Sequence, residues 1–134
     1  PVFSPDGRWL AYESDESGEQ EIYVRAFPGP GTKVQASVMQ GRHAIWSPSA
    51  KDLFYQSPSG RIMRVAYTVA GGTLTTSAPQ PASELEVPGD LMDVSRDGKN
   101  FVFIGPAGGE NVGVEVTFVM NFLDELRRRV AVGK

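Results

Sequence analysis

The only histidine of the chain, His43, is the residue best suited by type to acid–base or metal chemistry, and it directly follows Arg42. A histidine-based metal site needs several imidazoles, so a lone histidine cannot build one. Catalysis by His43 would also need a partnered nucleophile or base, and the adjacent sequence offers neither. We therefore expect no catalytic and no metal-binding role for His43, and we interpret it as a surface or channel-lining residue.

Other motifs that would indicate an enzyme are missing from the sequence. It contains no Gly-x-Ser-x-Gly nucleophile elbow and no Gly-x-x-x-x-Gly-Lys phosphate loop. The lack of cysteine excludes disulfides and thiolate metal sites. The acidic run at 15–21 offers oxygens to calcium but lacks the twelve-residue ligand spacing of an EF-hand, so we interpret it as a solvated hairpin turn. We predict no enzyme activity, no cofactor and no metal site.

A serine-centred turn followed by an apolar segment occurs three times. The serines stand 43 and 48 residues apart, a period that suits a four-stranded propeller blade and is too long for leucine-rich, ankyrin or tetratricopeptide repeats. A Ser-Pro-Asp-Gly sequence favours a turn because proline fixes φ, aspartate bonds to nearby backbone and glycine accepts a positive φ. The three turns are Ser4-Pro5-Asp6-Gly7, Ser47-Pro48-Ser49-Ala50 and Ser95-Arg96-Asp97-Gly98.

Strands are predicted on both sides of a second polar turn in each unit. The first strands are apolar at consecutive positions, which is typical of strands covered on both faces. The predicted first strands are 9–12, 53–55 and 101–104, the second strands are 21–27 and 61–67, and weaker outer strands are 33–39 and 73–76. Because three prolines interrupt 77–88, we expect mainly an extended loop there, with brief pairing at 84–87.

The C-terminal segment changes from a strand pattern to a helix pattern. Alternating apolar residues over 114–120 predict a strand. Phe122, Leu126 and Val130 then follow at helical i, i+4 spacing, and Asp124 can pair with Arg128. We expect a short helix at 121–130 that packs against the last unit as a structural cap.

The predicted fold is all-β, with antiparallel four-stranded blades of a β-propeller and a short C-terminal helix. The chain supplies about three blade units, at 1–41, 42–90 and 91–121, which is a partial propeller. The first unit begins at its serine turn, and we expect no inner strand before that turn. We therefore interpret the chain as a C-terminal fragment of a longer polypeptide. Open blade edges favour pairing with another chain, so a homo-oligomer is one expected arrangement.

The segment Phe3 to Val24 resembles the repeats of TolB-like, PD40-type propellers, and Ala44-Ile45-Trp46-Ser47-Pro48 is similar. The family pattern is a Trp-Ser-Pro-Asp-Gly turn, an aromatic-ended strand, a polar turn and an Ile-Tyr-Val strand. The segments 93–101 and 119–126 resemble the tails of bacterial proteins that join such a propeller to a serine/threonine kinase or a winged-helix regulator. The resemblance implies a six-bladed bacterial propeller; family members that act as lyases use several histidines, which this chain lacks.

Charge and hydropathy limit the partners. The net charge of −3 argues against nucleic acid, because the only basic cluster is Arg127-Arg128-Arg129. No apolar run reaches membrane-spanning length, so no membrane insertion is expected, and the compartment, periplasm or cytoplasm, stays open. Charged groups beside the predicted inner strands have no core role and are the candidate contacts for a protein or peptide partner: Arg42, His43, Asp93 and Arg96.

The leading hypothesis is a non-catalytic module for protein interaction or ligand sensing, attached to a kinase or regulator. An alternative is an accessory propeller part of a peptidase or lyase whose catalytic residues lie elsewhere. A third hypothesis is a purely structural half-propeller without a native ligand. The same blades serve receptors, scaffolds and non-catalytic lids, so the fold alone does not choose among these three.

Overall fold

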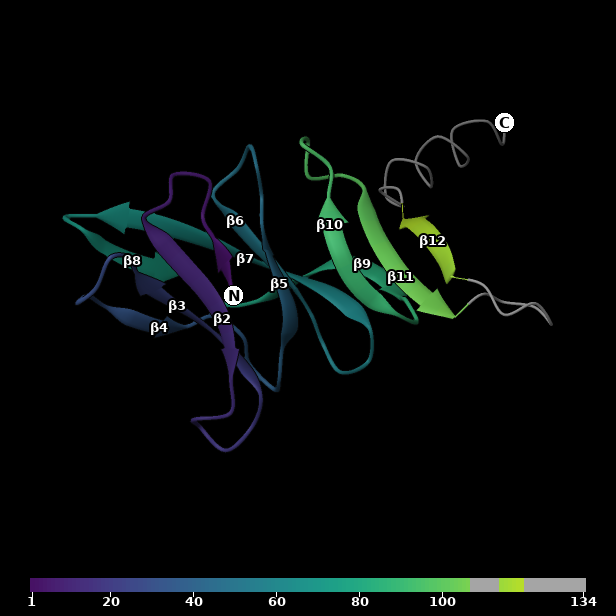
Figure 1. The fold of residues 1–134 in the computed structure, drawn as a ribbon, viewed down its shortest axis with the longest axis horizontal. Helices are drawn as coiled ribbons and strands as arrows, with labels where there is room; N and C mark the ends of the chain where they lie inside the picture. The colour runs from purple at the N-terminus through teal and green to yellow at the C-terminus, as the bar shows by residue number, and fades with distance from the viewer. Residues whose placement is uncertain (107–113, 120–134) are drawn as a thin grey trace, which may run out of the picture.

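The computed structural model describes residues 1–106 and 114–119, which contain twelve β-strands and no helix. All strand pairs are antiparallel, and the strands form three sheets along the chain (Figure 1). The all-β, antiparallel part of the predicted fold is therefore confirmed. These residues do not close a ring, so the propeller remains a prediction, and the helix predicted at 121–130 lies outside the described residues.

The first sheet has the order β1-β2-β3-β4, and the third has the order β10-β11-β12. In the second sheet, β5, β6, β7 and β8 follow one another, and β9 pairs with the other half of the long strand β7. The strands of the first sheet are β1 Val2–Phe3, β2 Trp9–Ser14, β3 Glu21–Ala26 and β4 Lys33–Gln35. Those of the second are β5 Arg42–Trp46, β6 Asp52–Gln56, β7 Arg61–Ala70, β8 Thr73–Thr76 and β9 Gln80–Glu86. The third contains β10 Asp90–Val94, β11 Phe101–Pro106 and β12 Val114–Val119.

Three strand predictions need correction. Residues 80–86 form the seven-residue strand β9 where mainly a loop was expected. Proline is tolerated there because β9 is an outer strand with one free edge, and Pro81 pairs with Met63 of β7. An inner strand, β1, does precede the first serine turn, since Val2 and Phe3 pair with β2. The outer strand expected at 33–39 is shorter, Lys33–Gln35, because the regular pairing with β3 ends at Gln35. Beyond it, the hydroxyl of Ser37 replaces a backbone carbonyl as the acceptor of the N–H of Ile22.

The Ser-Pro-Asp-Gly turns are stabilised by their own side chains. Ser4 Oγ accepts a hydrogen bond from the N–H of Trp9 at 3.0 Å and donates to Asp6 Oδ1 at 2.6 Å. Ser95 makes the equivalent pair of bonds, to the N–H of Asn100 at 2.9 Å and to Asp97 Oδ1 at 2.5 Å. The repeat serines are thus structural, as expected for hydroxyls in turns.

Acid should weaken the first of these turns. The hydrogen bond from Ser4, helped by the N–H of Arg8, holds the pKa of Asp6 below its ordinary value. The stabilisation is therefore complete above the unfolded pKa of about 3.9 and is lost as the pH falls through the lowered folded pKa. Asp6→Asn should cost no more than about 1 kcal/mol at neutral pH, because the carboxylate is exposed, and should flatten the acid loss of stability. Thermal unfolding followed by circular dichroism across acidic pH measures this, with Asp15→Asn as the control; an unchanged acid profile for Asp6→Asn would contradict it.

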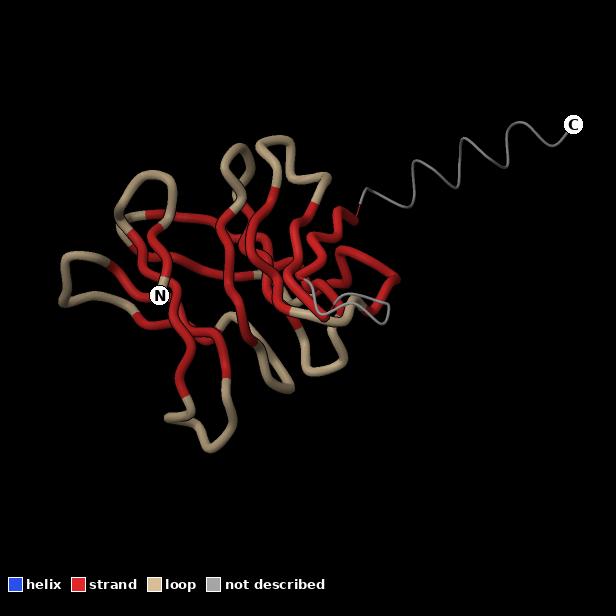
Figure 2. Tube along the Cα trace, turned by 45° about the vertical axis from the view of Figure 1, so that its right-hand side comes forward, coloured by secondary structure: helices blue, strands red, loops and turns tan. Residues whose placement is uncertain are grey.

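Apolar clusters join the sheets in chain order. One cluster lies between the first and second sheets, and the other lies between the second and third sheets. Trp46 of the first cluster contacts Tyr67 edge-on at 5.0 Å, and Phe54 of the second contacts Phe101 edge-on at 5.0 Å. The second sheet is therefore covered on both faces, as predicted for strands with consecutive apolar residues, and the loops gather at the strand ends (Figure 2).

Candidate functional site

The first strand of the second sheet, β5, lies between the first and third sheets (Figure 1). It contacts β1 and β2 on one side and β10 on the other. The sequence-predicted residues Arg42 and His43 open this strand. Side chains from all three sheets can therefore meet at the beginning of β5.

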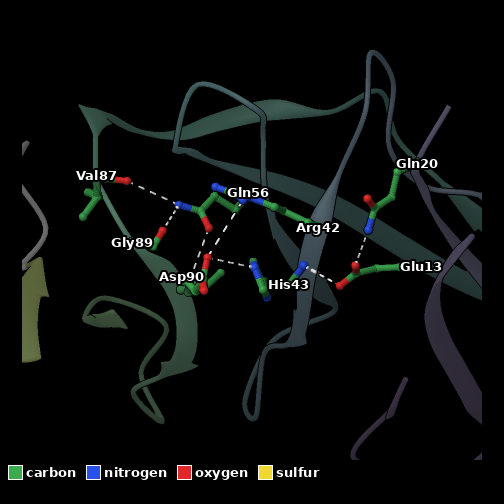
Figure 3. Close-up of polar contacts among 9 residues, drawn as sticks. Glu13, Gln20, Arg42, His43, Gln56, Val87, Gly89 and Asp90 are labelled. Atoms are coloured by element: carbon green, nitrogen blue, oxygen red, sulfur yellow. Dashed lines mark hydrogen bonds and ion pairs between the residues drawn. The ribbon is translucent and has the colours of Figure 1, made fainter. Parts of the chain in front are cut away.

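His43 connects the three sheets. Its backbone N–H donates to Glu13 Oε1 of β2 at 2.8 Å, and its Nε2 lies 3.2 Å from Asp90 Oδ1 of β10 (Figure 3). Its φ of 53° is in the left-handed region, which costs a residue with a Cβ on the order of 1 kcal/mol or more. Surrounding contacts must hold this conformation, and the bond to Glu13 is one of them.

The guanidinium of Arg42 lies beside the same carboxylate, with its Nη1 3.9 Å from Asp90 Oδ1. Both side chains are substantially exposed, so this ion pair contributes little to stability, at most about 1 kcal/mol. The Nε of Arg42 is buried without a hydrogen-bond partner among the described residues. Because the Arg42 side chain is 42% exposed, other N–H groups of its guanidinium can reach a ligand or partner.

Gln56 at the end of β6 binds the start of the third sheet. Its side chain is fully buried, and its Nε2 donates to the carbonyl of Gly89 at 2.9 Å and, at 3.4 Å, to that of Val87. Its Oε1 accepts the N–H of Leu91 at 3.2 Å. One amide therefore positions the strand β10, which carries Asp90 (Figure 3).

The loop before Arg42 is fixed by a buried carboxylate. Glu21 is 5% exposed, accepts a hydrogen bond from the hydroxyl of Ser37 and accepts the N–H of Gln40 at 3.0 Å. Met39 and Gln40 both have positive φ, at 60° and 73°. The prediction that the whole acidic run at 15–21 is a solvated turn is thus wrong at Glu21, which is buried at the start of β3 and holds this loop.

Two hollows flank Arg42 and His43. The inner pocket, about 230 Å³, lies against β2, β5 and β10 and combines Glu13 and His43 with apolar side chains that include Ile45, Leu91 and Met92. The amide pocket, about 220 Å³, is lined by Gln20, Gln40, Gly41, Arg42, Gln56 and Pro58. Gln20 also donates from its Nε2 to Glu13 Oε2 at 2.6 Å, so the two pockets share one polar wall.

The other two predicted site residues lie apart from this cluster. Asp93 is exposed and its Oδ1 accepts the N–H of Val94 at 2.8 Å, which is a local contact. Arg96 is exposed in the third serine turn, and its carbonyl accepts a hydrogen bond from Ser49 Oγ at 2.5 Å. The structure therefore brings Arg42 and His43 together but does not bring Asp93 or Arg96 to them.

Sequence reasoning missed Glu13, Gln56 and Asp90, although the repeat carried a signal for the first two. Glu13 and Gln56 stand nine residues after the serines of their turns, at the same repeat position. A polar residue that recurs at the end of an otherwise apolar strand indicates that it makes the same contact in each unit. Here both side chains accept a backbone N–H from the next sheet. Asp90 had no such repeat counterpart, because Arg42 occupies the equivalent position.

The chemistry available at this cluster is hydrogen bonding and charge pairing. Within residues 1–106 and 114–119, no hydroxyl is hydrogen-bonded to His43, and no group of three or more histidine or carboxylate residues could hold a metal ion. The same residues include no helix long and apolar enough to cross a bilayer. A pocket with apolar walls and a few polar groups at one end is suited to binding.

Comparison with known proteins adds no assignment. No protein-family model matches the chain, and no curated protein matches it either. The resemblance to TolB-like propellers therefore remains a prediction from the residues.

Proposed function

We propose that this chain is a non-catalytic β-propeller segment of the TolB-like kind that binds a protein or peptide partner at the beginning of β5. The observation that carries this proposal is the convergence of three sheets on His43, beside an inner pocket of about 230 Å³. The pocket supplies apolar contact area, and His43, Arg42 and their carboxylate neighbours supply directional polar contacts.

The rigidity of this site supports a binding role. The left-handed φ of His43 is maintained by Glu13, and the β10 wall is held by the buried amide of Gln56. A site whose side chains are already held in place loses less conformational entropy when a partner binds. The side chain of Arg42 is 42% exposed, so its guanidinium offers donors that a partner carbonyl or carboxylate can accept.

Selection of peptides on the folded chain tests the proposal. Peptides are enriched by phage display at neutral pH, and their affinity is then measured by fluorescence anisotropy for Arg42→Glu, His43→Ala and Arg96→Glu. We expect affinity to fall by about tenfold or more for the first two changes, because they remove contacts at the site, and to stay unchanged for Arg96→Glu. Peptides that bind all three variants equally, or no enrichment at all, would contradict the proposed site.

A further inference from the structure

Equivalent repeat positions are buried in the second and third sheets and exposed in the first. Phe3, Trp46 and Val94 each directly precede the serine of their turn. Trp46 and Val94 are 6% and 5% exposed, and each packs toward the sheet before it. Phe3 is 53% exposed. The difference follows from position, because no sheet among the described residues precedes the first.

The rest of this face follows the same rule. Leu53 and Tyr55 of β6 are both 1% exposed and face the first sheet, whereas their counterparts Leu10 and Tyr12 of β2 are only partly buried. Phe27 adds a second exposed ring, 4.9 Å from Phe3 and edge-on to it. We name Phe3, Leu10, Tyr12 and Phe27 the leading face. At Phe3, Leu10 and Tyr12 it presents residues of the types that the next sheet buries at the same positions, as Trp46, Leu53 and Tyr55.

The third sheet has an apolar residue at the position where the first and second sheets have a polar one. In those two sheets the polar residue bonds to the sheet that follows. Glu13 and Gln56 each accept a hydrogen bond from a backbone N–H of the following sheet. The donors are the N–H of His43 and the N–H of Leu91. The counterpart of Glu13 and Gln56 in the third sheet is Ile104, which is 40% exposed and has no polar group. We name Ile104 and its neighbour Val102 on β11 the trailing face of the third sheet.

We infer that the leading face is covered by the trailing face of a second copy of this chain, and that two copies form a closed ring with two-fold symmetry. At both internal junctions the face equivalent to the leading face packs against the trailing side of another sheet of the same repeat. Among the described residues, only the β10–β12 sheet has that side free. A ring of two copies is the smallest closed arrangement that uses both open faces of every copy, whereas a single contact would leave two exposed. This inference does not rest on the proposed binding site.

The solution mass and a pair of charged variants test this ring. Light scattering after size exclusion should give twice the 14.5 kDa mass of the chain across a dilution series. Phe3→Glu and Ile104→Lys should each weaken dimerisation by about tenfold or more, because each places a charge in both apolar contacts. Leu85→Lys is the matched control, since Leu85 is 43% exposed on β9, outside both faces, and should remain dimeric.

Mixing the two variants separates this ring from other dimers. In an equimolar mixture of the Phe3→Glu and Ile104→Lys chains, the mixed dimer has one contact between two unaltered faces. Its other contact places the new glutamate beside the new lysine. The molar mass measured by light scattering should therefore rise toward that of the dimer. An isologous dimer through two leading faces would instead leave Ile104→Lys dimeric, and that result would overturn the inference. An unaltered chain that is monomeric would also overturn the inference. In that case further sheets of a longer polypeptide would be the candidates that cover the leading and trailing faces. Circular dichroism checks the fold of each variant, and Phe27→Glu replaces Phe3→Glu if the latter unfolds.

Discussion

Gln56→Leu should lower the free energy of unfolding by about 3 kcal/mol, because a buried amide that serves two carbonyls and one N–H would be replaced by an apolar side chain. The buried N–H of Leu91 and the partly buried carbonyl of Gly89 would then lose their partner. Each unsatisfied buried group costs about 1–3 kcal/mol, partly offset by the added apolar burial. Urea unfolding followed by tryptophan fluorescence gives the difference.

The control for Gln56→Leu is Gln80→Leu, since Gln80 is exposed on β9. This change should alter the unfolding free energy by less than about 0.5 kcal/mol. If the two variants unfold alike, the amide of Gln56 does not hold the third sheet to the second. A loss confined to Gln56→Leu would support the order of sheets on which the candidate site depends.

Gly60→Ala should destabilise the chain by about 3 kcal/mol or more, of which about 1 kcal/mol comes from the left-handed backbone and the rest from a backbone clash. Gly60 has a φ of 88°, and a Cβ there would lie 2.5 Å from the carbonyl oxygen of Val87. The clash falls on the segment that leads into β10, which also receives the bonds of Gln56. The expected effect is a lower melting temperature and a looser junction between the second and third sheets.

Gly18→Ala separates the two causes, because Gly18 ends the equivalent hairpin turn of the first sheet. Its φ is 97°, but nothing lies within 4 Å of the position of a Cβ. Gly18→Ala should therefore lower the free energy of unfolding by only about 1 kcal/mol, from the left-handed backbone alone. Equal losses for Gly18→Ala and Gly60→Ala in thermal unfolding would show that the Val87 contact is unimportant.

The features that the sequence predicted correctly are local ones. The strand 73–76 coincides with β8, and the second strands begin where expected, at Glu21 and Arg61. Turn residues and consecutive apolar residues act over a few positions, so they can be recognised without tertiary information. The serine hydroxyls of the turns, at Ser4 and Ser95, also bond as expected.

The features that were missed depend on contacts between distant segments. Whether 80–86 becomes a strand depends on the free edge of β7, which the prolines of that segment do not reveal. Glu21 and Gln56 are polar residues buried because a particular loop or strand comes close enough to satisfy them. Of the candidate site, Arg42 and His43 were found as charged residues beside a strand, whereas Asp90 and the left-handed φ of His43 arise from sheet packing.

Nuclear magnetic resonance mapping of a selected peptide most directly tests whether the cluster around His43 is a binding surface. Backbone amide signals of the ¹⁵N-labelled chain are followed as the peptide is added. We expect shifts concentrated at the amides of Glu13, His43, Ile45 and Met92, which surround the inner pocket, with little change at Ser49 and Arg96. Shifts that concentrate at the serine turns or at the outer strands, with His43 unaffected, would contradict it.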